Sequence, residues 1–72
     1  MRKENNMSIV AVNTKKIIKQ RGLLQKKVAI DAGYTPKRFS DLLNNRKIVT
    51  DQDIIRIANV LRVSPNELFK SE

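Results

Sequence analysis

The sequence contains no cysteine and no histidine. Without cysteine there can be no disulfide and no thiolate metal site. Without histidine the chain lacks the commonest metal ligand and the usual proton-transfer group at neutral pH. The acidic residues are not clustered, and there is no glycine-rich loop that could cradle a phosphate, so no catalytic constellation can be assembled. We therefore expect neither an enzyme nor a cofactor-binding or metal-binding protein, and we expect no small-molecule ligand.

Long apolar runs are also missing. No stretch approaches the length of a bilayer span, and the N-terminus lacks the apolar segment of a signal peptide. We therefore expect a cytoplasmic protein without a membrane partner. The 72 residues suffice for one domain with a small helical core. This length is near the lower limit for a chain that folds without disulfides or bound metals.

Positive charge is abundant and unevenly distributed. The formal net charge is +8 and the pI is near 10.3. Residues 15–47 hold ten basic and two acidic residues, whereas residues 48–72 carry a net charge of −1. A lysine-rich solvated surface would explain the total, but the segregation favours a polyanionic partner for residues 15–47.

Two short helices joined by a tight turn are predicted between Gln25 and Asn44. Gly33 can adopt the positive φ that a sharp turn requires. Thr35 is a good N-cap, and Pro36 suits the first position of the second helix. Apolar side chains recur at helical spacing on both helices, namely Val28, Ala29 and Ala32 on the first and Phe39, Leu42 and Leu43 on the second. Such a pair of helices is the unit that places a helix in a DNA major groove.

Residues 1–12 are expected to form a flexible N-terminal leader or arm, followed by one domain over residues 13–70. Within the leader, the β-branched segment Ile9–Val12 is either an extended arm that packs on the core or on a second copy of the chain, or a loose lead-in. The first helix is expected to run from Asn13 to about Arg21 and to end at Gly22 in a left-handed conformation.

Two further helices are predicted after the residues Asn44 and Asn45, which are typical of a helix end. Thr50 and Asp53 have the spacing of a capping box, and Ser64–Glu67 predicts a second one. The core positions expected for these helices are Ile54, Ile57, Ala58 and Leu61 on the fourth, and Leu68 and Phe69 on the last. The sequence therefore predicts an all-α fold of five helices without an internal repeat.

Over residues 13–69 the chain resembles the phage-repressor and Cro-like (XRE) helix-turn-helix proteins. The resemblance lies in the joint spacing of four short motifs. These are the G-L-x-Q-x-x-x-A run from Gly22 to Ala29, the turn Gly33-Tyr34-Thr35, the core pair Phe39 and Leu42, and the sequence Leu61-x-Val63-Ser64 before the last helix. The resemblance implies a compact five-helix repressor-type domain in which helices two and three form the helix-turn-helix.

The resemblance also implies which residues contact DNA. The third helix would lie in the major groove. Base edges would be contacted by Pro36, Lys37 and Asp41 with Arg38 beside them, and the backbone by residues at the helix ends. The full expected set is Gln25, Lys26, Lys27, Thr35, Pro36, Lys37, Arg38, Asp41, Asn44, Arg46 and Lys47. The Gln25 amide would bond a phosphate and could also brace the third helix.

Chemistry leaves some of these roles open. Lys37 or Arg38 can donate to guanine O6 and N7, whereas Pro36 can make only apolar contacts. Asp41 can accept from cytosine N4, or it can pair with Lys37 or Arg38 and hold that side chain in place. Lys15, Lys16, Lys26 and Lys27 are either phosphate contacts or solubilising charge, and the sequence does not distinguish the two.

Several positions depart from the family pattern. The buried arginine and glutamate that the family often pairs are both apolar here, at Ile18 and Leu43, so no charge is left without a partner. Leu24 replaces a small polar cap, and Asn45 replaces a glycine. Ile30 falls where a polar residue is usual, so we expect an exposed apolar side chain that contacts Tyr34 or a partner chain.

Two classes of function remain from the sequence. The first is a sequence-specific regulator that binds double-stranded DNA, a repressor of the phage or mobile-element type. It would act as a homodimer, at least on DNA, through helices four and five or through Ile9–Val12. The second is an antitoxin-like or adaptor module that binds an acidic protein, which an exposed apolar patch of Ile30, Val60 and Phe69 would favour.

Overall fold

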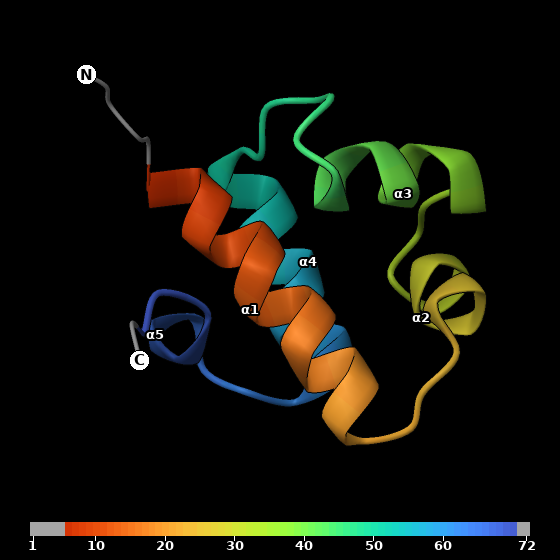
Figure 1. The fold of residues 1–72 in the computed structure, drawn as a ribbon, viewed down its shortest axis with the longest axis horizontal. Helices are drawn as coiled ribbons and strands as arrows, with labels where there is room; N and C mark the ends of the chain where they lie inside the picture. The colour runs from red at the N-terminus through yellow and green to blue at the C-terminus, as the bar shows by residue number, and fades with distance from the viewer. Residues whose placement is uncertain (1–5, 71–72) are drawn as a thin grey trace.

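The computed structural model describes residues 6–70, with side chains from residue 9 onward (Figure 1). These residues form five helices and no strand: α1 (Asn6–Gln20), α2 (Gln25–Asp31), α3 (Pro36–Leu43), α4 (Asp51–Leu61) and α5 (Pro65–Leu68). In Figure 1, α1 crosses the front of the molecule with α4 behind it, while α2 and α3 lie on one side and α5 on the other. The predicted all-α fold is confirmed.

The first helix begins at Asn6, so the expected start at Asn13 is wrong. The reason is that Val10, Thr14 and Ile18 follow one another at four-residue spacing and form one continuous inward face. Val10 is fully buried, and the Thr14 hydroxyl donates to the Val10 carbonyl at 2.7 Å. Ile9–Val12 is therefore helical and not extended, while residues 1–5 of the expected leader lie outside the described residues.

Asn13, expected as a helix cap, instead ties the two ends of the domain together. Its side-chain amide donates to the carbonyls of Leu68 at 2.7 Å and Lys70 at 2.8 Å. These bonds satisfy carbonyls at the end of α5, where a helix leaves acceptors without intrahelical partners. They fix α5 against the middle of α1.

The helix-turn-helix forms with the predicted local geometry. Gly22 ends the first helix at φ +66°, and Gly33 has φ +92° in the turn between α2 and α3. The Thr35 hydroxyl accepts from the Arg38 amide, and Pro36 occupies the first turn of α3. Asn45 adopts the left-handed conformation after α3. Local sequence thus encodes the end of α1, the turn between α2 and α3, and the start and end of α3.

The starts of α4 and α5 differ in how they are capped. At α4 the predicted capping box of Thr50 and Asp53 is present in both directions. At α5 the predicted box is wrong, because the Ser64 side chain makes no capping hydrogen bond. The Glu67 amide donates instead to the Ser64 carbonyl at 2.9 Å, which takes the donor that the hydroxyl would need in this one-turn helix.

The core is a single apolar cluster to which every helix contributes. α1 packs on α3 and α5, α2 on α3 and α4, and α4 on α5. Ile18 and Leu43, which stand where the family often has an ion pair, are both buried. Leu68 closes the core as expected, whereas Phe69 is 38% exposed. The largest fully buried side chains are those of Val10, Thr14, Phe39, Leu42, Leu43, Ile57, Leu61 and Leu68.

Candidate nucleic-acid interface

The outer surface of α3 is defined by the residues it does not bury. Phe39, Leu42 and Leu43 lie in the core, so helical spacing places Lys37 and Asn44 on the opposite side, where both are exposed. The first turn of α3 is exposed on all its residues up to Arg38. A helix held on two sides by α1 and α2 therefore presents one polar stripe that begins at its N-terminus.

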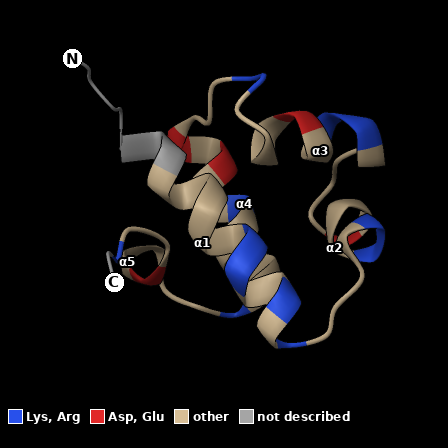
Figure 2. Ribbon diagram, viewed as in Figure 1, with Lys and Arg blue, Asp and Glu red and all other residues tan. Residues whose placement is uncertain are grey.

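Ten of the eleven expected DNA-contacting residues are exposed. They are Gln25, Lys26, Lys27, Thr35, Pro36, Lys37, Arg38, Asn44, Arg46 and Lys47. Lys and Arg residues extend over α1, α2, the first turn of α3 and the loop after it, while the acidic residues of α4 lie at its N-terminus (Figure 2). Much of the positive charge that the sequence concentrates in residues 15–47 therefore lies on α3, the following loop and the two helices that pack beside α3.

Asp41 is the exception, because it is buried and only 8% exposed. Its Oδ2 lies 3.5 Å from Lys37 Nζ and its Oδ1 lies 3.6 Å from Arg46 Nη1. The expectation of an outward-facing Asp41 is wrong, and the alternative of an ion pair with Lys37 is confirmed. The pairing with Arg46 arises because the Arg46 amide donates to the Asp41 carbonyl at 2.8 Å and so turns the loop back onto α3.

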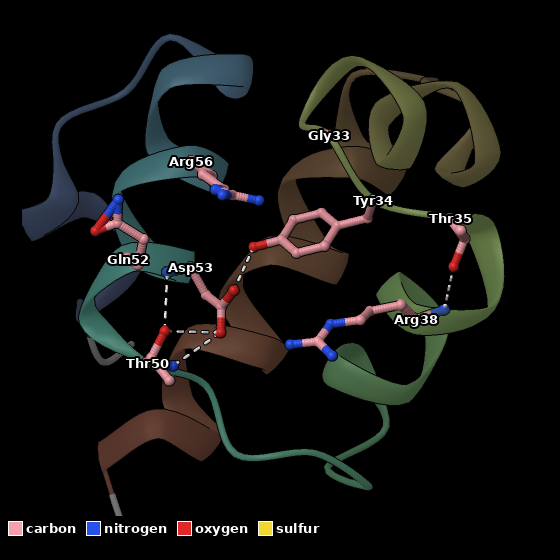
Figure 3. Close-up of a pocket in the computed structure, with 8 residues that line it drawn as sticks. All are labelled: Gly33, Tyr34, Thr35, Arg38, Thr50, Gln52, Asp53 and Arg56. Carbon is pink, nitrogen blue, oxygen red and sulfur yellow. Dashed lines mark hydrogen bonds between the residues drawn. The ribbon is translucent and has the colours of Figure 1, made fainter.

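Lys37 and Arg38 are neighbours in sequence but face different surfaces. Lys37 lies on the outer stripe, with its side chain 85% exposed. Arg38 lines an open cleft of about 420 Å³ between the first turns of α3 and α4, and Figure 3 shows its guanidinium directed toward Asp53. Consecutive residues on a helix point about 100° apart. Lys37 and Arg38 therefore cannot both point toward the same base pair.

The floor of this cleft is a hydrogen-bond network that joins the turn before α3 to the start of α4. The Tyr34 hydroxyl donates to Asp53 Oδ1 at 2.5 Å, and Asp53 Oδ2 accepts from the backbone N–H and the hydroxyl of Thr50. The Tyr34 ring also stacks on Phe39, with 5.6 Å between centroids. The network therefore fixes α3 relative to α4.

The network also shifts two pKa values. Burial and the hydrogen bond to Asp53 raise the pKa of Tyr34 well above its ordinary value of 10.0. Burial alone would raise the pKa of Asp53, but the bonds from Tyr34 and Thr50 and the nearby Arg38 hold it below its ordinary 3.8. Asp53 is thus a buried carboxylate that stays ionised at neutral pH.

Some of the residues expected to contact the DNA backbone already form ion pairs or hydrogen bonds within the protein, and others do not. Lys27 pairs with Asp31 at 3.3 Å. The Asn44 amide donates to Ser40, and its oxygen accepts from Lys15 Nζ at 3.4 Å. Lys15, whose role the sequence left open, therefore lies at the C-terminal end of α3. The Gln25 side chain makes no hydrogen bond to residues 6–70, so the expected brace on α3 is not formed.

Arg56 is a cleft residue that the sequence analysis did not identify. Its guanidinium lies over the Tyr34 ring at 5.6 Å and lines the same cleft as Arg38. The signal available was the three-residue spacing of Asp53 and Arg56, which places both on one side of α4. Over residues 6–70 there is no group of acidic side chains that could hold a metal ion, and no helix is long and apolar enough to cross a membrane.

Comparison with curated proteins and comparison with solved structures each return no match. The family model of the Cro/C1-type helix-turn-helix DNA-binding domain, in contrast, matches residues 13–72. This range includes the helix-turn-helix, the cationic surface around α3 and both helices that follow. The chain belongs to the Cro/C1-type helix-turn-helix DNA-binding family.

Proposed function

We propose that the protein is a sequence-specific transcriptional regulator of double-stranded DNA, a repressor of the phage or mobile-element type, with α3 in the major groove. The observation that carries this proposal is the polar stripe on α3, which starts at an exposed first turn and is surrounded by lysine and arginine. In this family architecture the N-terminal residues of the second helix of the motif reach base edges.

The proposed contacts fall into three groups of residues. Lys37 is the base-contacting residue, because it is the cation on the outer stripe, and Pro36 beside it can contact only apolar groups such as a thymine methyl. Lys15, Asn44, Arg46 and Lys47 would contact the backbone at one end of α3. Thr35, Gln25, Lys26 and Lys27 would do so near the turn and at α2.

A homodimer on DNA is part of the proposal. A single domain of this size contacts few base pairs, and two half-sites about one turn of DNA apart would supply the missing affinity and specificity. The surfaces available on α4 and after α5 include Ile55, which is 48% exposed, and Phe69. Selection of duplexes from a random pool would yield two half-sites with a fixed spacing if this assembly forms.

The test of the proposal compares two lysines in matched settings. Lys37 and Lys27 are each paired with an aspartate four residues later, at 3.5 Å and 3.3 Å. With duplexes selected from a random pool, we expect Lys37→Ala to weaken the selected sequence by roughly tenfold and random duplex much less. Lys27→Ala should weaken both alike and lower the salt slope by about 0.9. Affinity is measured by fluorescence anisotropy at several salt concentrations.

Two outcomes would contradict the proposal. Equal effects of the two substitutions on selected and random duplex would show that α3 does not contact base edges. A wild-type protein that selects no sequence, and binds duplex only as its charge dictates, would fit the adaptor function. Ile30, which is 57% exposed, would then be the first residue to test for partner binding.

A further inference from the structure

The cleft between α3 and α4 is lined by two arginine side chains. Arg38 comes from the first turn of α3, and Arg56 comes from the middle of α4 (Figure 3). Within residues 6–70 neither guanidinium lies within 4.0 Å of a carboxylate oxygen. Guanidinium groups are planar donors that suit the oxygens of phosphate, so the cleft holds unused donors of the correct kind.

The position of Arg56 is set by the helix-turn-helix itself. Its guanidinium lies over the face of Tyr34, and a Cβ added at Gly33 would be 3.7 Å from its Nη1. Contact with an aromatic face restricts an arginine side chain without using its hydrogen-bond donors. Arg56 is therefore held against the turn while its N–H groups remain available to a ligand.

The one acidic residue of the cleft does not neutralise this pair. Asp53 accepts hydrogen bonds on both oxygens, from Tyr34 on one and from Thr50 on the other. Its charge is stabilised by these hydrogen bonds and by the nearby Arg38, and the cleft as a whole keeps a formal charge of +1 from Arg38, Arg56 and Asp53. Thr50 and Gln52 add polar groups at the rim.

We propose that this cleft is a phosphate site in which Arg56 and Arg38 bind the phosphate backbone of the DNA that α3 contacts. The inference rests on the proposed function, because the first turn of α3 forms one wall of the cleft. A helix that enters the major groove has a phosphate backbone along each side. Arg38 then binds backbone and not a base, and Arg56 is an additional DNA-binding residue on α4.

The experiment compares Arg56→Gln with Arg62→Gln, which removes the same charge from the residue that ends α4. We expect Arg56→Gln to weaken selected and random duplex alike, by roughly tenfold at moderate salt, and to lower the salt slope by about 0.9. Arg56→Lys should retain the slope but recover only part of the affinity, because an ammonium cannot bind a phosphate bidentately. Arg62→Gln should change the affinity less than twofold. Circular dichroism verifies that each variant is folded.

The outcomes separate this inference from the function on which it rests. If wild-type protein selects a DNA sequence but Arg56→Gln and Arg62→Gln bind it equally, the phosphate site is wrong and the proposed function stands. If wild-type protein selects no sequence, the proposed function fails first. A titration with inorganic phosphate, followed by NMR, distinguishes the source of the phosphate. Saturable shifts at Tyr34 that disappear in Arg56→Gln, together with unchanged DNA affinity, would overturn the backbone assignment in favour of a free phosphate ligand.

Discussion

Asp41 limits the positions of two largely exposed cations at α3, Lys37 and Arg46. Its carboxylate bridges Lys37 on the same helix and Arg46 in the following loop, and its side chain is only 12% exposed. Ion pairs contribute little to stability when the cation is as exposed as Lys37 and Arg46 are, so the main effect of Asp41 is on geometry. It limits the positions of two flexible side chains before DNA arrives, and it also places a negative charge close to the expected path of the phosphates.

Asp41→Asn should therefore have opposite effects on two classes of DNA. Random duplex should bind roughly three- to tenfold more tightly, because one negative charge is removed from the interface. The preference for the selected sequence should fall, because Lys37 is no longer held in one position. Anisotropy titrations of both duplexes measure the ratio. Asp31→Asn, which removes the matching partner of Lys27 on α2, serves as the control and should leave the preference unchanged. A preference that survives Asp41→Asn would show that Lys37 needs no alignment.

At the scale of the helices, local signals predicted most of the fold. The left-handed glycines, the Thr35 cap and the Thr50–Asp53 box depend on residues close in sequence, and all are present. The cleft was not predicted, because it requires Tyr34 in the turn and Arg56 on α4, which are distant in sequence, to meet in the folded chain. The four-residue spacing of Lys37 and Asp41 indicated their ion pair. The ion pair between Arg46 and Asp41 was not indicated, because it forms only when the loop after α3 folds back onto the helix.

The start of α4 should make the stability of the domain sensitive to acid. Because the pKa of Asp53 in the folded state lies below its ordinary 3.8, the unfolded chain binds more protons as the pH falls through this range. The stabilisation is therefore complete above about pH 4 and is lost at lower pH. Asp53→Asn removes the acceptor on the Thr50 side and the charge that Tyr34 bonds, at an expected cost of about 2 kcal/mol at pH 7.

Urea unfolding of wild-type protein and Asp53→Asn between pH 7 and pH 3 tests this expectation. The difference in unfolding free energy should shrink as the pH falls below the ordinary pKa of Asp53. Asp51→Asn, at an exposed position of the same first turn, should cost only about 0.5 kcal/mol through the helix dipole. A difference between wild type and Asp53→Asn that stays constant over the whole range would mean that Asp53 is not the titrating group.

At the scale of the whole molecule, α1 contributes buried side chains to the core from Val10 onward. Taken by itself, Ile9–Val12 is short and β-branched, which is why the sequence predicts a domain that begins at residue 13. The structure joins it to the following residues in one helix, so that Val10, Thr14 and Ile18 share an inward face. The burial of Val10 can be predicted only when Ile9–Val12 is assigned to the same helix as Thr14 and Ile18, because the four-residue spacing is then visible.

Two valines of the same helix test this boundary, because one belongs to the core and the other does not. Val10 is fully buried, whereas Val12 is 53% exposed. Val10→Ala should lower the free energy of unfolding by about 2 kcal/mol, since it removes two buried methyl groups and leaves a cavity. Val12→Ala should change it by less than about 0.5 kcal/mol. Both substitutions alter helix propensity equally, so that contribution cancels in the comparison. Urea unfolding measures both variants, and equal small effects would mean that residues before Asn13 are an arm and that the core begins later in the chain.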